Sequence, residues 1–447
     1  MLLLPIKSFL VAAILLELKS IYGQQLLSQE QNTNNTTTNI NLNCQCYPHD
    51  GNGARIAYLI TLHDKLTIHE CQYLLQSIMG PGAIIIIHID TKLPFKEFER
   101  SELKRLIDDG GNATCGSKII VDSIFNLDWG QWSMNHPTLW AMNMLTSDQT
   151  LVNKWDVFIN LSADTIPIYT PQIMSELFDS NGRKGLLHGI NFVTSSSCVT
   201  GLVPTDISVF PERWHKRNHY ATNPDREFVI NYFNDETGEN ETDVLTIHFG
   251  SQWMVLTPQF VEYISVSLQK PDSLPSKFRD ELILRRKLMS DETFIPTLLV
   301  HHETFRKTLP QISEDGSLVG SEGIFAIRYE RMDEHAPDAF GQVINQQRYD
   351  VPASVDIQVP RPWGPYYLGV YDLANIKESG AIFARKVSKS VDSNLFNLLP
   401  VNEKEEIPSI QWPEEIKITQ KIDWNEFKRR YKRRHTSSKN DKESNEL

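Results

Sequence analysis

Ala54-Arg55-Ile56-Ala57-Tyr58-Leu59-Ile60-Thr61-Leu62 is a continuous apolar run with the length of a β-strand. A segment with apolar residues at helical spacing follows at 69–79, and Gly80-Pro81-Gly82 ends it. A second apolar run, Ala83 to Ile89, is rich in β-branched residues and leads into Asp90. Strand, helix and strand in this order form a βαβ unit, and strands that are apolar on both faces indicate a parallel sheet covered on both sides.

The same alternation continues along the chain. We expect further elements in this order: a helix at 95–107, a strand at 119–121, a helix at 134–145, a strand at 155–161, a strand at 251–256, a helix from Pro258 and a helix opened by Ser290. After about Arg328 the pattern changes to short strands and turns, including an aromatic turn at Arg361-Pro362-Trp363-Gly364-Pro365. The sequence therefore predicts an α/β fold with a mostly parallel central sheet and a C-terminal extension.

The two ends of the chain differ from this middle part. Residues 1–23 combine Lys7 with an apolar stretch and a small-residue end, which is typical of a signal peptide or an uncleaved signal-anchor. Residues 24–53 are polar and without periodicity, so we expect a disordered stem, followed by one folded domain at 54–400. Residues 401–447 are charged, with a basic cluster at 428–434, and are expected to be a disordered tail. The N-terminal segment places the protein in the lumen of the secretory pathway.

Composition narrows the class of protein. A chain of 447 residues with 40% hydrophobic residues suits a globular enzyme, and a net charge of −12 argues against a nucleic-acid binder. Five cysteines (Cys44, Cys46, Cys71, Cys115, Cys198) permit two disulfides and leave one thiol, and their spacing does not match a zinc site. Asn-X-Ser/Thr glycosylation motifs begin at Asn34, Asn35, Asn112, Asn160 and Asn240, and Asn160 lies in an apolar run where we expect it to be buried and unmodified.

Glu292 is the sharpest candidate for catalysis. It lies in Ser290-Asp291-Glu292-Thr293-Phe294, about forty residues after Gly250-Ser251-Gln252-Trp253. A carboxylate there could deprotonate an acceptor hydroxyl while a sugar leaves its diphosphate, with Trp253 and Phe294 as an apolar wall for the sugar ring. The alternative is a helix start, where Ser290 caps and acidic residues favour the dipole without any catalytic purpose.

Other polar residues follow strands, where ligands of open parallel sheets bind. Asp90 could hold a uracil ring or ribose hydroxyls, or could merely cap the next helix; Asp164 could orient a ligand or form a turn. Trp129-Gly130-Gln131-Trp132 is expected to be a tight aromatic turn packed on the sheet.

The charge of a leaving diphosphate needs a positive partner. After a suitable strand the sequence has no convincing Asp-X-Asp motif, which commonly holds a divalent metal on a nucleotide diphosphate, so Arg or Lys would have to replace the metal. Arg385-Lys386, after an apolar strand-like segment, is the best placed pair, although an exposed strand end explains it equally well.

Several segments of the chain, in their order along the sequence, resemble the core-2/I-branching family of β-1,6-N-acetylglucosaminyltransferases, which also includes peptide O-xylosyltransferases. They are 57–60, 87–90, 129–130, 159–162 with Asp164 and Pro167, 250–253, 291–292 and 383–386. The resemblance covers about 54–387 and implies a GT-A type nucleotide-sugar-binding fold. It also implies inverting transfer from a UDP-sugar without a metal or other cofactor.

The resemblance implies residue roles as well: Glu292 as the catalytic base, Lys386 as a diphosphate ligand and Asp90 in the nucleotide site. Arg361 is the nearest match to the family's second basic ligand, and the family has an acid before proline where Asp164 lies. We expect an N-acetylglucosaminyltransferase of the Golgi that acts on a glycan or glycoprotein acceptor and is anchored to the membrane by its N-terminus or soluble after cleavage. The alternatives are a xylosyltransferase acting on protein serine and a catalytically silent glycan-binding relative.

Overall fold

The structure is a computed structural model of the 447-residue chain. It describes residues 52–63, 67–93, 98–108, 115–179, 187–193, 196–197, 227–235, 237–285, 289–309, 328–330, 367–379 and 381–401. The expected targeting segment, all but the last two residues of the stem, the aromatic turn at 361–365 and the tail after Val401 lie outside the described residues.

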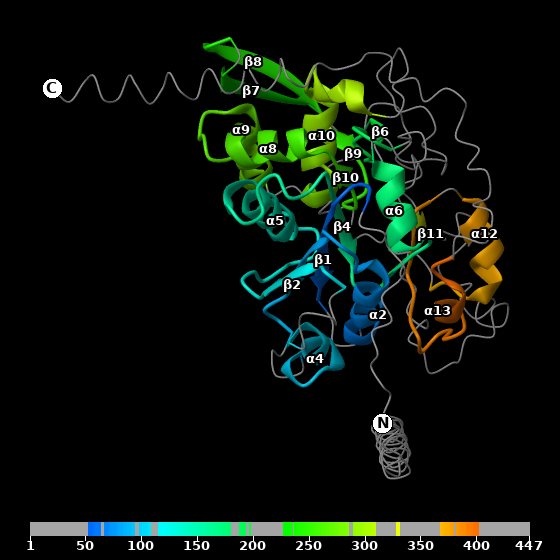
Figure 1. The fold of residues 1–447 in the computed structure, drawn as a ribbon. Helices are drawn as coiled ribbons and strands as arrows, with labels where there is room; N and C mark the ends of the chain where they lie inside the picture. Colours follow the sequence, from blue (N-terminus) through cyan, green and yellow to red (C-terminus); the bar gives the residue numbers. More distant parts are fainter. Residues whose placement is uncertain are drawn as a thin grey trace, which may run out of the picture. The chain divides into compact units, whose positions relative to one another are not determined.

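A five-stranded sheet forms the centre of the fold (Figure 1). Its strands are β1 (Ile56–Leu62), β2 (Ile84–Ile89), β3 (Lys118–Asp122), β4 (Val157–Ser162) and β10 (Val255–Leu256), in the order β10-β4-β1-β2-β3. The four longer strands pair in parallel, and β10 pairs antiparallel to β4 at the edge. This confirms the predicted α/β fold with a mostly parallel central sheet.

Helices cover both faces of this sheet. Figure 1 places α5 (His136–Ser147), α8 (Pro258–Ser267), α9 (Leu274–Leu284) and α10 (Phe294–His301) on one side, and α2 (Ile68–Ile78) and α6 (Pro171–Phe178) on the other. The first group shares one apolar core with alternate residues of the strands, such as Ala57 and Leu59. Because successive strand side chains point to opposite faces, the remaining residues of β1 and β2 pack on the second face, so both strands are almost completely buried.

Smaller elements complete the fold. The strand β12 (Phe383–Arg385) lies between β11 (Arg328–Glu330) and β5 (Thr165–Pro167), which directly follows β4. β6 (Ser196–Ser197) pairs with β9 (His248–Phe249), and β7 (Glu227–Asn234) forms a hairpin with β8 (Glu239–Thr246). The remaining helical segments are α4 (Glu102–Asp108), α12 (Leu373–Glu378), α13 (Leu395–Leu398) and the 3₁₀ turns η3 (Trp132–Asn135), η6 (Ser290–Glu292), η7 (Phe305–Thr308) and η8 (Val370–Asp372).

The helix expected at 95–107 is present in its described part but is interrupted: residues 98–99 and α4, which begins at Glu102, are α-helical, with a turn between them. Two local predictions were wrong. The strand expected at 251–256 is reduced to β10 at its last two residues. Ser290 does not cap α10: it begins the separate turn η6, and Thr293 stands between the two with a non-helical φ of −122°.

Two of the five cysteines can be compared with the expectation of two disulfides and one free thiol. Cys71 in α2 is free and buried, and burial, followed by the neighbouring Glu70 carboxylate, raises the pKa of its thiol to about 12. Cys115 is disulfide-bonded. The other three cysteines lie outside the described residues.

Candidate active site

The carboxyl ends of three neighbouring strands define one edge of the central sheet. Leu62 of β1 lies opposite Ile89 of β2, and Thr61 lies opposite Ser162 of β4, so these strands end at the same level. Asp90 directly follows β2 and Asp164 follows β4 after one residue, as the sequence predicted. Ligands of open α/β sheets bind at this edge, so both acids are in a suitable place.

Asp90 is buried and holds the turn after β2. Its backbone N–H donates to the Leu62 carbonyl (2.8 Å), and its Oδ1 accepts from the Lys92 N–H (2.9 Å). The Lys92 Nζ lies 3.6 Å from its other carboxylate oxygen. These bonds shape a local turn of the kind that Asp commonly forms. A role for Asp90 in nucleotide binding therefore stays a prediction.

A cavity of about 690 Å³ lies beside this turn, between α4 and the end of β3. Thr91, which directly follows Asp90, lines it together with Phe98, Asp122 and Ser123. Its mixture of apolar and polar lining and its place at the sheet edge suit a ring with hydrogen-bonding groups. The sequence offered no signal for this cavity, because its walls come from three separate segments.

Asp164, Arg385 and Trp253 form a compact cluster at the end of β4. The Arg385 Nε donates to Asp164 Oδ1 at 2.9 Å, with side chains 13% and 5% exposed. The guanidinium carbon of Arg385 lies 5.1 Å from the centre of the Trp253 ring, a cation–π arrangement. Burial alone would raise the pKa of Asp164, but the charges of Arg385 and Lys386 and a hydrogen bond from Ser162 hold this pKa well below its usual range. Asp164 is therefore an anion that fixes Arg385 on Trp253.

Lys386 is fixed through its backbone. Its carbonyl accepts from the Leu368 N–H (2.7 Å), and the next residue, Val387, donates to the Asp164 carbonyl (3.0 Å). The Lys386 Nζ lies 5.8 Å from the centre of the Tyr367 ring. The structure thus joins Arg385 and Lys386 to Asp164 at the sheet edge, whereas Arg361 lies outside the described residues.

Glu292 ends the tight turn η6, which several backbone bonds hold in place. The Gly250 N–H donates to the Glu292 carbonyl (2.7 Å), and the Met289 N–H donates to the Gly130 carbonyl (2.8 Å). Met289 adopts the left-handed conformation (φ 56°) that begins this turn. The Glu292 side chain is half-buried, whereas its neighbour Asp291 is buried, and burial raises the pKa of Asp291 to about 6. Of the two acids, Glu292 is the more accessible.

Two aromatic predictions were wrong. Phe294 is fully buried between Trp132 (ring centres 5.1 Å apart) and Phe278 (5.8 Å), so its ring contributes to the core and cannot form the wall of a sugar site. Of the 129–132 turn that was expected in the core, Trp132 does pack against the core, whereas Trp129 is 58% exposed.

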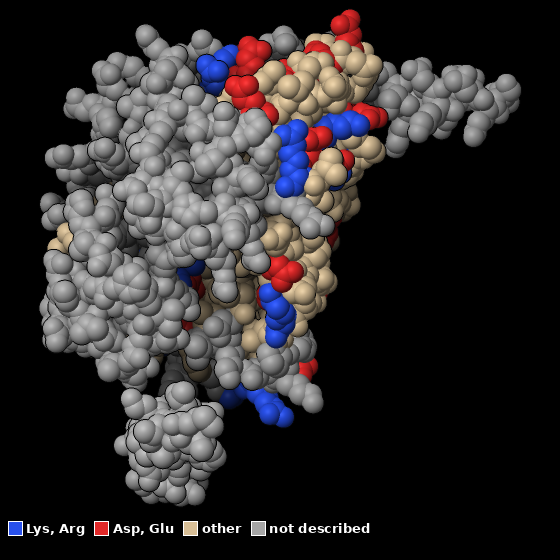
Figure 2. Space-filling view, turned by 180° about the vertical axis from the view of Figure 1, so that it is seen from behind, with Lys and Arg blue, Asp and Glu red and all other residues tan. Residues whose placement is uncertain are grey.

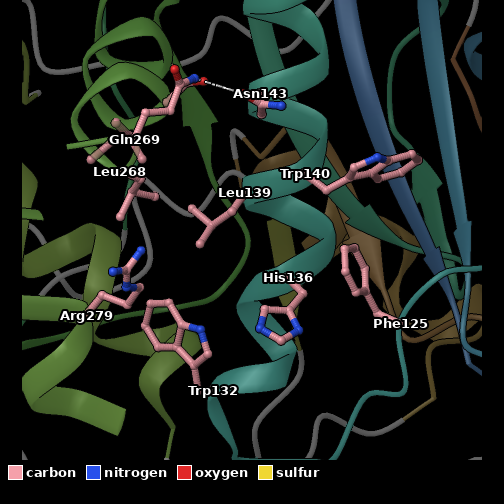
Figure 3. A pocket seen from close by; sticks show the side chains of 11 residues that line it. Phe125, Trp132, His136, Leu139, Trp140, Asn143, Leu268, Gln269 and Arg279 are labelled. Atoms are coloured by element: carbon pink, nitrogen blue, oxygen red, sulfur yellow. Dashed lines mark hydrogen bonds between the residues drawn. The ribbon is translucent and has the colours of Figure 1, made fainter. Parts of the chain in front are cut away.

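The turn at 129–132 leads to an aromatic cavity that sequence reasoning missed (Figure 3). This cavity of about 400 Å³ lies between α5 and the helices α8 and α9. Figure 3 shows Leu139 and Trp132 on the side of α5 that faces Leu268 and Arg279, and Trp140 beside Phe125 on the other side, while the Gln269 Nε2 donates to Asn143 Oδ1 (3.2 Å) at one end. In the sequence Trp132, His136 and Trp140 are four residues apart, but this spacing is also typical of core packing.

The surface charge and the search for membrane spans and metal-ligand clusters do not identify a further functional feature in the described residues. Acidic and basic side chains are interspersed on the described surface visible in Figure 2. Among the described residues, no helix is long and apolar enough to cross a membrane, and no group of three or more His, Cys, Asp or Glu could hold a metal ion. The expected membrane anchoring and metal independence stay predictions.

Comparisons with known proteins find relatives among sugar-transferring enzymes. A human "probable beta-1,3-galactosyl-O-glycosyl-glycoprotein beta-1,6-N-acetylglucosaminyltransferase 7" is 27% identical over 49% of this chain and 45% of its own length. Xylosyltransferase 2 from dog and from human is 26% identical over 56% of this chain and 25% of its own length. The chain thus spans less than half the length of these curated relatives.

A crystal structure of mouse xyloside xylosyltransferase 1 in its apo form aligns with 56% of this chain and 82% of its own, at 11% identity and a TM-score of 0.28. The family model described as "Core-2/I-Branching enzyme" matches residues 56–313, which is more than half of the chain and includes β1, β4, Trp253 and Glu292. The chain belongs to the core-2/I-branching enzyme family.

Proposed function

We propose that this protein is an inverting glycosyltransferase of GT-A type that moves N-acetylglucosamine from a UDP-sugar to a hydroxyl of a glycan acceptor. The observation that carries the proposal is the arrangement at the sheet edge. There, Glu292, the more accessible acid of its turn, is tied through Gly250 to the segment that ends in Trp253. The Trp253 ring contacts Arg385, and Lys386 is the residue after Arg385.

The reaction follows from these groups. Glu292 takes the proton of the acceptor hydroxyl, whose oxygen attacks the anomeric carbon from the side opposite the diphosphate. The new carbon–oxygen bond forms as the bond between that carbon and the diphosphate oxygen breaks, which inverts the anomeric centre. UDP leaves with the electron pair, and the positive charges of Lys386 and Arg385 stabilise the leaving diphosphate.

Arg385 is a weaker diphosphate ligand than Lys386, because Asp164 already neutralises its charge at 2.9 Å. Its main contribution is to position Trp253 and the following lysine. Asp90 and the cavity beside Thr91 are the candidate site for the uridine. The aromatic cavity next to the Glu292 turn is the candidate site for acceptor sugars, since aromatic rings pack on sugar faces and planar polar side chains fix their orientation.

A xylosyltransferase acting on protein serine is the second candidate, supported by the 26% identity to xylosyltransferase 2. A panel of UDP-sugars separates the two, because only the true donor should be hydrolysed and should raise the midpoint of thermal unfolding. We expect the largest effect with UDP-N-acetylglucosamine. A response to UDP-xylose alone would select the second candidate, and binding of glycans without any donor response would indicate a silent relative.

We propose that Lys386 neutralises the leaving diphosphate. Lys386→Ala should weaken UDP binding measured by calorimetry, and added salt should weaken binding to the unmodified protein as well. Lys154→Ala, which removes an exposed lysine remote in sequence, is the matched control and should change affinity by less than about 0.5 kcal/mol. Equal UDP affinities for both variants would contradict the proposal and would turn attention to Arg361.

Transfer should also proceed without a divalent metal or other cofactor. The proposal rests on the missing Asp-X-Asp motif and on the basic pair at 385–386. Activity should survive excess EDTA. A loss of activity that manganese restores would contradict it.

We further propose that the enzyme acts in the lumen of the secretory pathway, in the Golgi, either anchored by residues 1–23 or released by their cleavage. The composition of that segment supports this location. The name of the human relative, which refers to a glycoprotein, is consistent with it.

A further inference from the structure

The two faces of the β7–β8 hairpin differ in their contacts. On the inner face Phe228 and Leu245 are fully buried, and the Phe228 ring lies 5.6 Å from that of Phe278 in α9. On the outer face Val229, Phe233 and Val244 are 61%, 40% and 52% exposed. The hairpin lies at the margin of the fold, away from β1 and β2 (Figure 1). Val229 and Val244 pair directly across the two strands, and the polar pair Asn231 and Thr242 separates them from Phe233, so apolar surface on this face is exposed to water on both sides of that polar pair.

An Asn-X-Thr glycosylation motif lies on that same outer face. Asn240 of β8 pairs directly with Phe233 of β7, and directly paired residues of antiparallel strands share a face of the sheet. Asn240 and Thr242 are two positions apart, so both side chains point outward with Phe233, and both are exposed. The Thr242 hydroxyl donates to Asn231 Oδ1 (2.6 Å) on the same face.

The other such motif in the described part of the chain has the opposite surroundings. Asn160 lies inside β4 and is only 4% exposed. Its Nδ2 donates to the Gln252 carbonyl (2.6 Å), and its Oδ1 accepts from the Met254 N–H (2.6 Å). A bulky group on this nitrogen would break the link between β4 and β10, so the folded protein excludes it.

We infer that Asn240 carries an N-linked glycan whose first sugars pack across Phe233 and cover the apolar outer face of the hairpin. The inference rests on the lumenal location proposed above. There the Asn240 amide nitrogen would attack the anomeric carbon of a lipid-diphosphate-linked oligosaccharide supplied by the cell. The nitrogen–carbon bond forms, the carbon–oxygen bond to the diphosphate breaks, the lipid diphosphate leaves with the electron pair, and the nitrogen loses one proton to a base.

The register explains why the glycan suits this face. A sugar ring presents an apolar face of C–H groups, and the aromatic ring directly across the hairpin from Asn240 offers an apolar surface at neighbouring distance. A surface glycan is bulky and solubilising, so it would shield Val229 and Val244 from water and from other chains. Because Asn240 lies on the outer face of the hairpin, a glycan attached to Asn240 is the group that would cover this face.

Site mapping tests the attachment. The full chain is produced in a secreting eukaryotic cell with a glycosylation acceptor tag at its C-terminus, which reports entry into the lumen independently. Enzymatic release of glycans in ¹⁸O-water should label Asn240 and leave Asn160 unlabelled. Asn240→Gln and Thr242→Val should each lose the mass of one glycan, whereas Thr242→Ser should keep it. A modified tag with unlabelled Asn240 overturns the inference alone; an unmodified tag overturns it together with the proposed location.

Dye binding tests the covering of the hairpin face. Release of the glycan from the native protein should increase the fluorescence of a dye that binds apolar surfaces. Phe233→Ser, or the milder Val244→Thr, should reduce this increase, because each removes apolar surface from the outer face. An unchanged signal after release overturns the packing against Phe233. A dimer that persists with the glycan attached and disappears in Val244→Thr would instead identify a second copy of the chain as the occupant.

Discussion

Glu292 illustrates how one side chain can be accessible within a rigid frame. Its turn is fixed by backbone bonds to Gly250 and Gly130, while its carboxylate remains half-buried beside the fully enclosed Asp291. Glu292→Gln should lower turnover by roughly the 10²–10⁴-fold typical of a lost general base and leave UDP affinity nearly unchanged. Glu303→Gln, on a carboxylate side chain that is 94% exposed, is the control and should keep full turnover. Near-normal turnover of Glu292→Gln would remove this residue from the mechanism.

The Asp164–Arg385 pair offers a second test at this scale, because the chain contains a matched pair at its surface. Asp164→Asn leaves the guanidinium of Arg385 buried without its carboxylate, which should lower the free energy of unfolding by about 3–5 kcal/mol. Asp156→Asn breaks the pair with Arg55, whose side chains are 40% and 39% exposed, and should cost about 1 kcal/mol or less. Urea unfolding of both variants measures the difference. Equal losses would mean that Asp164 does not carry the buried charge.

At the scale of elements, the inner strands β1, β2 and β4 were predictable because they are buried on both faces and almost entirely apolar. Residues 84–89, for example, are all buried, and no surface helix or loop would have this composition. The position of Asp90 and Asp164 after such strands followed directly. The α/β fold class could be predicted from this pattern and from the helices expected between the strands.

Pairings between distant segments were not predictable in the same way. β12 joins β5 across more than two hundred residues, and this pairing brings Arg385 to Asp164. The sequence placed Arg385 at a strand end but had no signal for its partner. The turn η6 was mistaken for the start of a helix because Ser-Asp-Glu is a good helix-start sequence. The non-helical conformation of Thr293, which separates η6 from α10, cannot be predicted from composition.

Asn160 provides a prediction about how elements are joined. Its amide satisfies the Gln252 carbonyl and the Met254 N–H, and so ties β4 to the segment that carries Trp253. Asn160→Ala leaves both backbone groups without this partner and should lower the free energy of unfolding by about 2–4 kcal/mol. Turnover per folded molecule should also fall, because Trp253 loses its frame. A drop in stability below about 0.5 kcal/mol would show that water or another group replaces the amide.

At the scale of the whole molecule, buried ionisable groups should couple stability to pH. Burial lowers the pKa of His88 and of His248 to about 4, with His301 adding to the shift of His248. In the unfolded chain both titrate near their usual value of about 6.5. Between these values the unfolded state binds more protons than the folded state, so stability falls as the pH drops from about 6.5 to 4.

Asp291 acts in the opposite direction in part of this range. Burial raises its pKa to about 6, so between its unfolded value near 4 and pH 6 the folded state binds the extra proton, and stability rises as the pH drops. Burial also lowers the pKa of His302 to about 4 and lowers the pKa of His136 and His301, so several histidines oppose one aspartate and the net effect should be destabilisation in acid. Asp164, whose folded pKa is lowered, stabilises the fold at neutral pH and loses this contribution only below about pH 4.

Two variants separate these contributions, because one removes the titrating aspartate and the other removes one of the titrating histidines. Asp291→Asn should raise stability at pH 7, where the buried carboxylate is ionised, and should steepen the loss of stability between pH 6 and 4. His248→Gln should flatten that loss, by up to about 1.4 kcal/mol per pH unit if the full shift of this one group is realised. Urea unfolding at intervals from pH 7.5 to 4 measures all three proteins. A wild-type stability that is constant or rises in acid, or an Asp291→Asn curve parallel to it, would contradict the assignment of these groups.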